Sequence, residues 1–342
     1  MPNNSTKILF LMTLISGVLI SLCANSWLGA WMGLEINLLS FIPILSSSKN
    51  MFSTEASLKY FLVQAIASST LLFMILVKTN LNEMFHLVKN NEWNNLMITP
   101  LLLKVACAPF HWWIPSVMEG LTWLNCFILL SVQKIAPLML ISYMLINNLF
   151  IQMMIISTAF IGAVGGLNQT SIRKILAFSS INHMGWMIVA MMMGSNLWFM
   201  YFTVYLINII TIIMITSVTN LSYISQTFNL MNNKKIIKFM LFISMLSLGG
   251  LPPFTGFFPK WIIIQFMTQN LMIFTSMILI MTSLLTLFYY MRIMYSTLLI
   301  SSSETSWVTL MYLKFLHPKM TMLFLSMIIL GMLTSTLIIS MY

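Results

Sequence analysis

The chain has 342 residues, of which 59% are hydrophobic and only 6% are charged, whereas a soluble domain carries roughly 25% charged residues. This composition excludes an ordinary soluble domain and is typical of an integral membrane protein. The net charge of +10 could suggest nucleic acid as a partner, but the cations form no stripe interleaved with aromatic side chains, so no nucleic-acid binding is expected.

Hydrophobic runs near or above the roughly 20 residues that cross a bilayer recur along almost the whole chain. Because a lipid-exposed segment must satisfy its backbone hydrogen bonds internally, these runs predict helices. We expect eleven spans, near residues 6–24, 26–46, 55–78, 95–114, 121–145, 150–168, 174–192, 196–219, 236–268, 271–297 and 320–341. The polar segment 80–95 is interpreted as a surface loop or a partner-contact strip. Residues 1–342 are expected to form a single membrane domain.

Two of these spans, the fourth and the ninth, are broken by prolines, and each carries a lysine. Lys104 precedes Pro109 in the fourth span, whereas Lys260 follows Pro252-Pro253 in the ninth. Broken helices that hold a charge at membrane depth are typical of ion and proton pathways in transporters. The two segments therefore predict a transport function.

The spacing of the broken spans predicts an internal repeat. They are five spans apart, so residues 6–145 and 150–297 are interpreted as equivalent five-helix repeats, with the helix at 320–341 added at the end. Because five is odd, the second repeat enters the membrane from the opposite side. The predicted fold is therefore an all-α integral membrane protein of about eleven transmembrane helices, with two inverted repeats whose fourth helices are broken, and one C-terminal helix.

The cations outside the span centres sort to one side of this topology. If the helices alternate, the opposite side receives only Lys78 and Lys89. The N-terminal side receives Lys7, Lys49, Arg173, Lys174, Lys234, Lys235, Lys238, Arg292, Lys314 and Lys319. Loops rich in Lys and Arg stay on the negative side of a membrane. We therefore expect the N-terminus on that side and the C-terminus across the membrane.

Four charged residues, Glu35, Lys104, Lys134 and Lys260, fall near the centres of four different spans. Each costs roughly 2.5 to 3.5 kcal/mol there unless it pairs or meets water. Ion pairs that only hold helices together would explain them, but three lysines outnumber one glutamate, which favours a functional role. Burial and nearby carboxylates shift a lysine between charged and neutral forms, so lysines joined by water can pass protons.

Further polar side chains in these spans could line such a pathway. They are His111, Ser131, Gln133, Ser179, Ser180, His183 and Gln265. A structural hydrogen bond between helices explains His183 equally well, and a polar cap at the break explains His111 equally well. No carboxylate or second histidine falls at ligand spacing around either histidine, so no metal site is expected.

Cysteines and glycines give no sign of a cofactor site. Cys23, Cys107 and Cys126 are isolated, which favours packing roles, and three cysteines are too few for the usual four ligands of an iron–sulfur cluster. The small residues at 162–166 follow an apolar run with no strand before it. They predict close helix packing and not a phosphate-binding turn.

Seven segments between about residue 5 and 300 resemble one family. They are Trp31-Met-Gly-Leu-Glu35-Ile-Asn, Ser53-Thr-Glu-Ala-Ser-Leu-Lys59-Tyr-Phe, Leu103-Lys104-x3-Ala-Pro109-Phe-His111-x-Trp-x-Pro115, Gln133-Lys134-Ile-Ala-Pro137, Gly165-Gly-Leu-Asn-Gln-Thr-Ser-Ile-Arg173-Lys174, Phe178-Ser-Ser-Ile-Asn-His183-Met-Gly-Trp186 and Leu251-Pro-Pro-Phe-Thr-Gly256-Phe-Phe-Pro-Lys260-Trp261. Together they are similar to mitochondrially encoded chain 2 proteins of NADH:ubiquinone oxidoreductase, respiratory complex I, and most of all to insect forms.

The resemblance implies one of three antiporter-like subunits in the membrane arm of that complex, built on two inverted five-helix repeats. It implies that Glu35 pairs with Lys104, that Lys134 is the central proton relay and that Lys260 is the terminal relay. NADH, FMN, iron–sulfur clusters and ubiquinone are then expected on other subunits. The chain would belong to an H+-translocating NADH:ubiquinone reductase without redox catalysis of its own.

The resemblance also implies a multi-pass protein of the mitochondrial inner membrane, with its N-terminus in the matrix and its C-terminus in the intermembrane space. Expected partners are the other membrane-arm subunits, including neighbouring antiporter-like subunits, and membrane lipids such as cardiolipin. Two alternatives stay open, namely a stand-alone cation/proton antiporter and a non-conducting structural spacer of the membrane arm.

Overall fold

The structure is a computed structural model, and it describes residues 5–47, 50–84, 90–230, 235–299, 326 and 328. Its helices are α1 (Ser5–Cys23), α2 (Trp27–Leu45), α3 (Met51–Met84), α4 (Asn90–Val105), α5 (Trp113–Gly120), α6 (Trp123–Leu130), α7 (Val132–Ser142), α8 (Leu149–Gly165), α9 (Ile172–Met193), α10 (Ser195–Thr219), α11 (Ile224–Leu230), α12 (Lys235–Gly249), α13 (Phe257–Gln269) and α14 (Ile273–Leu299). The prediction of an all-helical protein is confirmed for this part of the chain.

Several of these helices are long and apolar enough to cross a membrane. They are α1, α2, α3, the combined α6–α7 segment, α9, α10 and α14, which makes seven within the described residues. Two shorter apolar helices cover 149–165 and 239–249. The chain is therefore a multi-pass membrane protein. Helices stand where the first ten spans were expected, whereas the expected helix at 320–341 lies almost entirely outside the described residues.

Two sequence interpretations were wrong in detail. The segment 80–95 was expected to be a loop, but α3 continues to Met84 and α4 begins at Asn90. The span at 121–145 was expected to be continuous, but it is interrupted at Ser131, whose φ of −111° and ψ of −83° are not helical. The Ser131 hydroxyl donates to the carbonyl of Phe127 at 2.6 Å, and such back-bonding of serine to the preceding turn bends helices.

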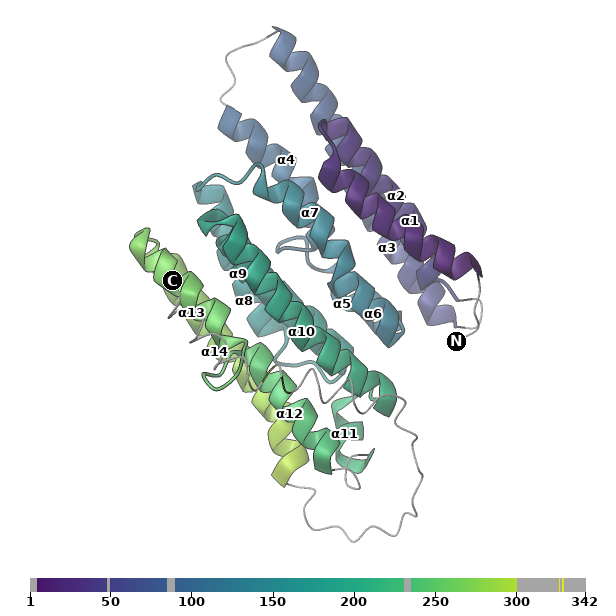
Figure 1. The fold of residues 1–342 in the computed structure, drawn as a ribbon, viewed down its shortest axis with the longest axis vertical. Coiled ribbons are helices and arrows are strands. Elements are labelled where there is room, and N and C mark those ends of the chain that lie inside the picture. The colour runs from purple at the N-terminus through teal and green to yellow at the C-terminus, as the bar shows by residue number, and fades with distance from the viewer. Residues whose placement is uncertain are drawn as a thin grey trace. The chain divides into compact units, whose positions relative to one another are not determined.

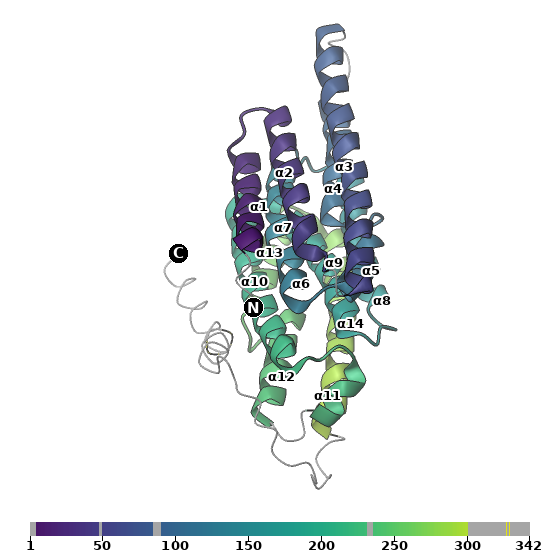
Figure 2. The same ribbon diagram turned by 90° about the vertical axis from the view of Figure 1, so that its right-hand side faces the viewer.

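The chain divides into two compact units, residues 1–158 and 159–342, with the boundary inside α8. In the first unit, α2 packs against α1 and α3, α3 packs against α4 and α5, and α7 packs against α4 (Figure 1). Figure 2 shows the long α3 beside α4 and α5 from a second direction. In the second unit, α10 packs against α9, α12 and α13, while α14 packs against α12 and α13.

Small residues allow close contact between neighbouring helices in both units. A Cβ atom at Gly33 of α2 would lie 2.5 Å from the backbone nitrogen of Ser21 in α1. A Cβ atom at Gly162 of α8 would lie 2.5 Å from the backbone nitrogen of Asn182 in α9. The predicted close packing at 162–166 is therefore confirmed, and only glycine fits at both crossings.

Substitution of Gly33 by valine should destabilise the protein. The added side chain meets the backbone of Ser21, which cannot rotate away, so α1 and α2 must separate. Overpacking of this kind costs about 1 to 3 kcal/mol. We expect a lower thermal midpoint of the purified protein in its assembled state. Gly194→Ala is the control, because nothing lies within 4 Å of its added Cβ, and equal midpoints for the two variants would contradict the packing argument.

Candidate functional site

The break between α4 and α5 lies directly after Lys104. α4 ends at Val105, and Ala106 takes a left-handed φ of 61°, which turns the chain out of the helix. The Nε1 of Trp113, the first residue of α5, donates to the carbonyl of Leu103 at 3.1 Å and ties the two halves together. The predicted break is confirmed. Lys104 stands in the last turn of α4, where the helix dipole stabilises a positive charge.

A small cavity connects this helix end with α7 inside the first unit. Both Lys104 and Lys134 line it, and its volume is about 20 Å³. One water molecule needs roughly 10 to 15 Å³ on this measure, provided that polar partners are present. The two lysines are 7% and 2% exposed, so the surrounding protein shields both from solvent. The cavity can therefore hold about one water molecule, and two buried lysine residues line it.

Polar side chains from three helices surround this cavity. Asn37 of α2 and Gln133 of α7 exchange two hydrogen bonds, with Nδ2 to Oε1 at 3.0 Å and Nε2 to Oδ1 at 3.1 Å. The hydroxyl of Tyr60 in α3 donates to the same Oε1 of Gln133 at 3.2 Å. Gln64 donates from Nε2 to the backbone carbonyl of Lys104 at 3.4 Å. The sequence analysis identified Gln133 but missed Asn37, Tyr60 and Gln64.

Glu35 interacts electrostatically with its surroundings. Glu35, on α2, acts on the charge of Lys104, but no direct ion pair within 4.0 Å joins these two residues. The Oε2 atom of Glu35 is buried and has no hydrogen-bond partner. Cys107, a buried free cysteine, lies in the break between α4 and α5. Within the first unit, Lys104 and Lys134 thus line the same cavity, whereas Glu35 is not one of its lining residues.

Lys260 spans the second break, between α12 and α13, with its side chain. α12 ends at Gly249, and the next residue, Gly250, has a φ of 80°. Lys260, in the first turn of α13, reaches back and donates to the carbonyl of Gly249 at 3.0 Å and to that of Leu248 at 3.5 Å. Its Nζ also lies 5.7 Å from the ring centre of Trp186 in α9. The charge therefore lies at the carbonyl end of a helix and near an aromatic face, both of which stabilise cations.

A buried cluster around His183 lies in the same unit. The ring Nδ1 of His183 lies 2.8 Å from the hydroxyl of Tyr201 in α10, and the ring centres of His183 and Tyr205 are 5.1 Å apart. Tyr205 and Tyr290 lie beside Ser180 and Ser179, respectively. The hydroxyls of both serines donate to backbone carbonyls one turn earlier in α9. The sequence analysis named the histidine and the serines but missed the tyrosines, because an aromatic residue in an apolar span is typical of core packing.

Three other residues that were expected to line the pathway lie elsewhere in the structure. The Nδ1 of His111 lies 3.2 Å from the carbonyl of Pro109 at the first break, and the imidazole ring is half-buried. Ser131 is buried at the interruption between α6 and α7. Gln265 lies on the exposed side of α13. Within the described part of the chain, no three His, Cys, Asp or Glu side chains gather in a way that could hold a metal ion.

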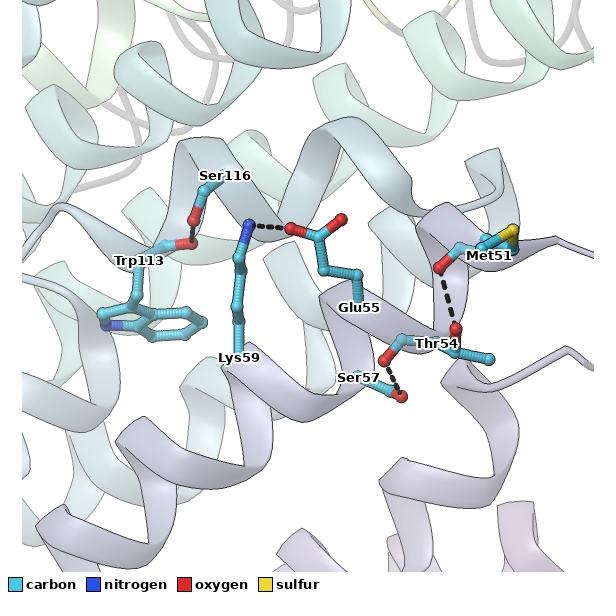
Figure 3. A network of polar contacts seen from close by, with 7 residues as sticks. All are labelled: Met51, Thr54, Glu55, Ser57, Lys59, Trp113 and Ser116. Carbon is cyan, nitrogen blue, oxygen red and sulfur yellow. Dashed lines mark hydrogen bonds and ion pairs between the residues drawn. The ribbon is translucent and has the colours of Figure 1, made fainter.

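One further pair of charges lies apart from the cavity. Lys59 and Glu55 form an ion pair one turn apart on α3, and their side chains are 47% and 60% exposed (Figure 3). Trp113 and Ser116 of α5 are drawn in the same view, in the helix that packs against α3. This exposed pair does not line the cavity.

The geometry is that of a membrane protein with two lysine-bearing broken helices, and comparison with known proteins gives its family. The family model described as NADH:quinone oxidoreductase/Mrp antiporter, TM, matches residues 24–286. The chain belongs to this family. The match includes both broken helices and all four of the charged residues expected at mid-depth, so the resemblance found in the sequence is confirmed.

Curated members of the family are similar over most of their length. The NADH-ubiquinone oxidoreductase chain 2 of Anopheles gambiae is 49% identical over 302 residues, which cover 88% of each chain. That of Aedes aegypti is 50% identical over 309 residues, or 90% of each chain. That of Dugong dugon is 38% identical over 303 residues, or 87% of each chain. The similarity to insect members agrees with the sequence motifs.

Solved structures share the fold at low sequence identity. A chain of respiratory complex I from Thermus thermophilus superposes with a TM-score of 0.83 at 20% identity and covers 98% of this chain and 79% of that one. A chain of the Mrp complex from Dietzia sp. gives a TM-score of 0.75 at 18% identity, with 87% and 61% covered. The fold is therefore shared between respiratory and antiporter complexes.

Proposed function

We propose that this chain is the antiporter-like chain 2 subunit of a proton-pumping NADH:ubiquinone oxidoreductase and that it carries protons between Lys104 and Lys134. The names of the insect relatives support the assignment to the complex. The observation that carries the transport role is the cavity that both buried lysines line, since it has room for a bridging water. Two titratable amines that share one buried water form the smallest unit of a proton relay.

In the proposed cycle, a change in a neighbouring subunit alters the interaction between Glu35 and Lys104. When the Glu35 carboxylate no longer stabilises the positive charge of Lys104, this lysine releases a proton more readily. The proton passes through the cavity to Lys134, and Lys260 later exchanges it with one aqueous side. Placement of Lys260 at the end of α12 supports its role, because the free carbonyls there can bind either the ammonium group or water.

The spacing of the helices supports the proposed internal repeat. α8, α9, α10, α12 and α13 begin at Leu149, Ile172, Ser195, Lys235 and Phe257, each 144 or 145 residues after the start of α1, α2, α3, α4 or α5. The two relay lysines are 156 residues apart and do not share this spacing, but their charged groups lie at matching helix ends. Gly249, whose carbonyl accepts from Lys260, comes 145 residues after Lys104. The two charges thus occupy comparable helix ends within their own repeats, although one precedes its break and the other follows it.

The remaining assignments follow from membership of the complex. We place the protein in the mitochondrial inner membrane, with its N-terminus in the matrix, because of the biased distribution of Lys and Arg. Its partners would be the other membrane-arm subunits, and lipids including cardiolipin would cover the rest of its exposed apolar surface. Redox cofactors and ubiquinone would bind elsewhere in the complex, so the chain would contribute proton transfer to an enzyme whose electron transfer it does not perform.

The dependence of proton movement on NADH tests this function against a stand-alone antiporter. In vesicles that contain the assembled complex, we expect proton uptake to begin when NADH and quinone are added. An imposed Na⁺ or K⁺ gradient without NADH should move no more protons than it does in empty vesicles. The measurement is the fluorescence of an internal pH dye. Proton exchange driven by the cation gradient alone would overturn the proposal and favour an antiporter.

A further inference from the structure

The hydrogen bonds that Gln133 already makes leave its amide able to donate one further hydrogen bond but not to accept another. Its Oε1 accepts from Asn37 and from Tyr60, which occupies both lone pairs of a carbonyl oxygen. Its Nε2 donates one hydrogen to Asn37 and keeps the other. Asn37 and Tyr60 are themselves buried, so bulk water does not compete for these bonds. Towards anything inside the cavity, Gln133 can therefore only donate.

A donor in this wall orients a water molecule in a way that suits proton transfer. Water that accepts from Gln133 has a second lone pair for the ammonium of Lys104, and it keeps both hydrogens for donation. Transfer then breaks one N–H bond at Lys104 and forms one O–H bond at the water. A different O–H bond of the same water breaks, and an N–H bond forms at neutral Lys134. The water is regenerated, and one positive charge has moved from one lysine to the other.

We propose that Asn37 and Tyr60 are positioning residues for this step, because they fix the Gln133 amide as a donor towards the cavity. The inference rests on the proposed function and adds two residues to it. If Tyr60 were absent, one lone pair of Oε1 would be free to accept from the water, which would turn a water hydrogen away from the lysines. If Asn37 were absent, the amide of Gln133 could rotate.

The proposed repeat contains the same two residue types again. Asn182 in α9 and Tyr205 in α10 stand 145 residues after Asn37 and Tyr60, and both are buried. The Oδ1 of Asn182 has no hydrogen-bond partner. The position 145 residues after Gln133 is Ile278, so the second repeat has no amide for these two residues to hold. The positioning role is therefore proposed for the first unit alone.

An exchange of the two amides is the sharpest test. Asn37→Gln and Gln133→Asn each change the length of one partner, whereas the double variant restores the summed length of the pair. Tyr60→Phe removes one hydroxyl and keeps the shape of the ring. Asn125→Ala is the matched control, because Asn125 of α6 donates to the carbonyl of Ile44 at 3.1 Å and also ties the α6–α7 segment to α2, but it does not line the cavity. Each variant is studied in the assembled complex in vesicles.

We expect each single amide variant to slow the transfer about tenfold, as the loss of one well-placed hydrogen bond would. Protons moved per electron should fall towards the value of Lys134→Met, and the double variant should recover part of the loss. Tyr60→Phe should show the same fall, with a thermal midpoint lowered no more than that of Asn125→Ala, since each loses one hydrogen bond. Asn125→Ala should lower the midpoint and leave protons per electron unchanged.

Two results distinguish the positioning role from the proposed proton relay on which it rests. If Lys134→Met lowers protons per electron but Tyr60→Phe and the amide variants do not, the positioning role is wrong and the relay stands. If Lys134→Met itself moves a full complement of protons, the relay is wrong as well. An equal fall for Asn125→Ala and Asn37→Gln would assign the amide pair to helix packing alone. Should the amide variants fail to assemble, Tyr60→Phe decides the question by itself.

Discussion

Replacement of Lys134 by methionine is expected to give an assembled complex that oxidises NADH but moves fewer protons per electron. Methionine has nearly the length of lysine and no titratable group, and it suits a site that is only 2% exposed. The substitution keeps the packing of α7 and removes the acceptor on the far side of the cavity. The measurement is the ratio of protons taken up to electrons transferred, in vesicles that contain the complex.

Lys59→Met is the matched control for this prediction. It makes the same chemical change in the same unit, but Lys59 is half-exposed on α3 and pairs with Glu55 away from the cavity. We expect its proton ratio to equal that of the unaltered complex. If Lys134→Met moved as many protons per electron as the unaltered complex, the relay would be wrong and a structural spacer would be favoured.

Gly256→Ala should prevent accumulation of the assembled complex. A Cβ atom at Gly256 would lie 1.7 Å from the carbonyl oxygen of Ser247 and 2.8 Å from its carbon, so the start of α13 would have to move away from α12. That movement would also draw Lys260 away from the Gly249 carbonyl that it now binds. Overpacking lowers the free energy of unfolding, and against backbone atoms this loss is about 3 kcal/mol or more.

The amount of complex on native gels and its thermal midpoint measure this effect. Gly249→Ala is the control, since its added Cβ would meet only side-chain atoms of Tyr290 and Leu287, at 3.5 to 3.6 Å. This variant should assemble at normal levels. Normal assembly of Gly256→Ala would show that the break between α12 and α13 tolerates rearrangement, contrary to the packing described for it.

The helices and the two breaks could be predicted because their causes are local. A membrane span needs an uninterrupted apolar run of a certain length, and a proline in a helix interior removes one helix hydrogen bond. Pro43, Pro100 and Pro137 nevertheless lie inside the helices α2, α4 and α7, so proline alone did not identify the breaks. The breaks at Pro109 and at Pro252-Pro253 were predicted because each proline lies in an apolar run that also carries a lysine. The interruption at Ser131 was missed, because a single serine in an apolar run carries no comparable signal and bends a helix only when its hydroxyl bonds the preceding turn.

The charged members of the candidate site could also be predicted, whereas its neutral members could not. Charge at membrane depth is costly enough to identify Lys104 and Lys134 from their positions alone. Asn37 and Tyr60 carry no such cost, because a hydrogen-bonded amide or phenol is common inside proteins. Their importance arises from Gln133, which lies more than 70 residues away along the chain from both and meets them only in the folded unit.

The most direct test of the proton relay is a structure of the assembled complex at a resolution that shows ordered water between α4 and α7. The account predicts a water within hydrogen-bond distance of both Lys104 and Lys134 in at least one state of the catalytic cycle, with the Gln133 amide donating to it. A dry gap between the two lysines in every state would contradict the account.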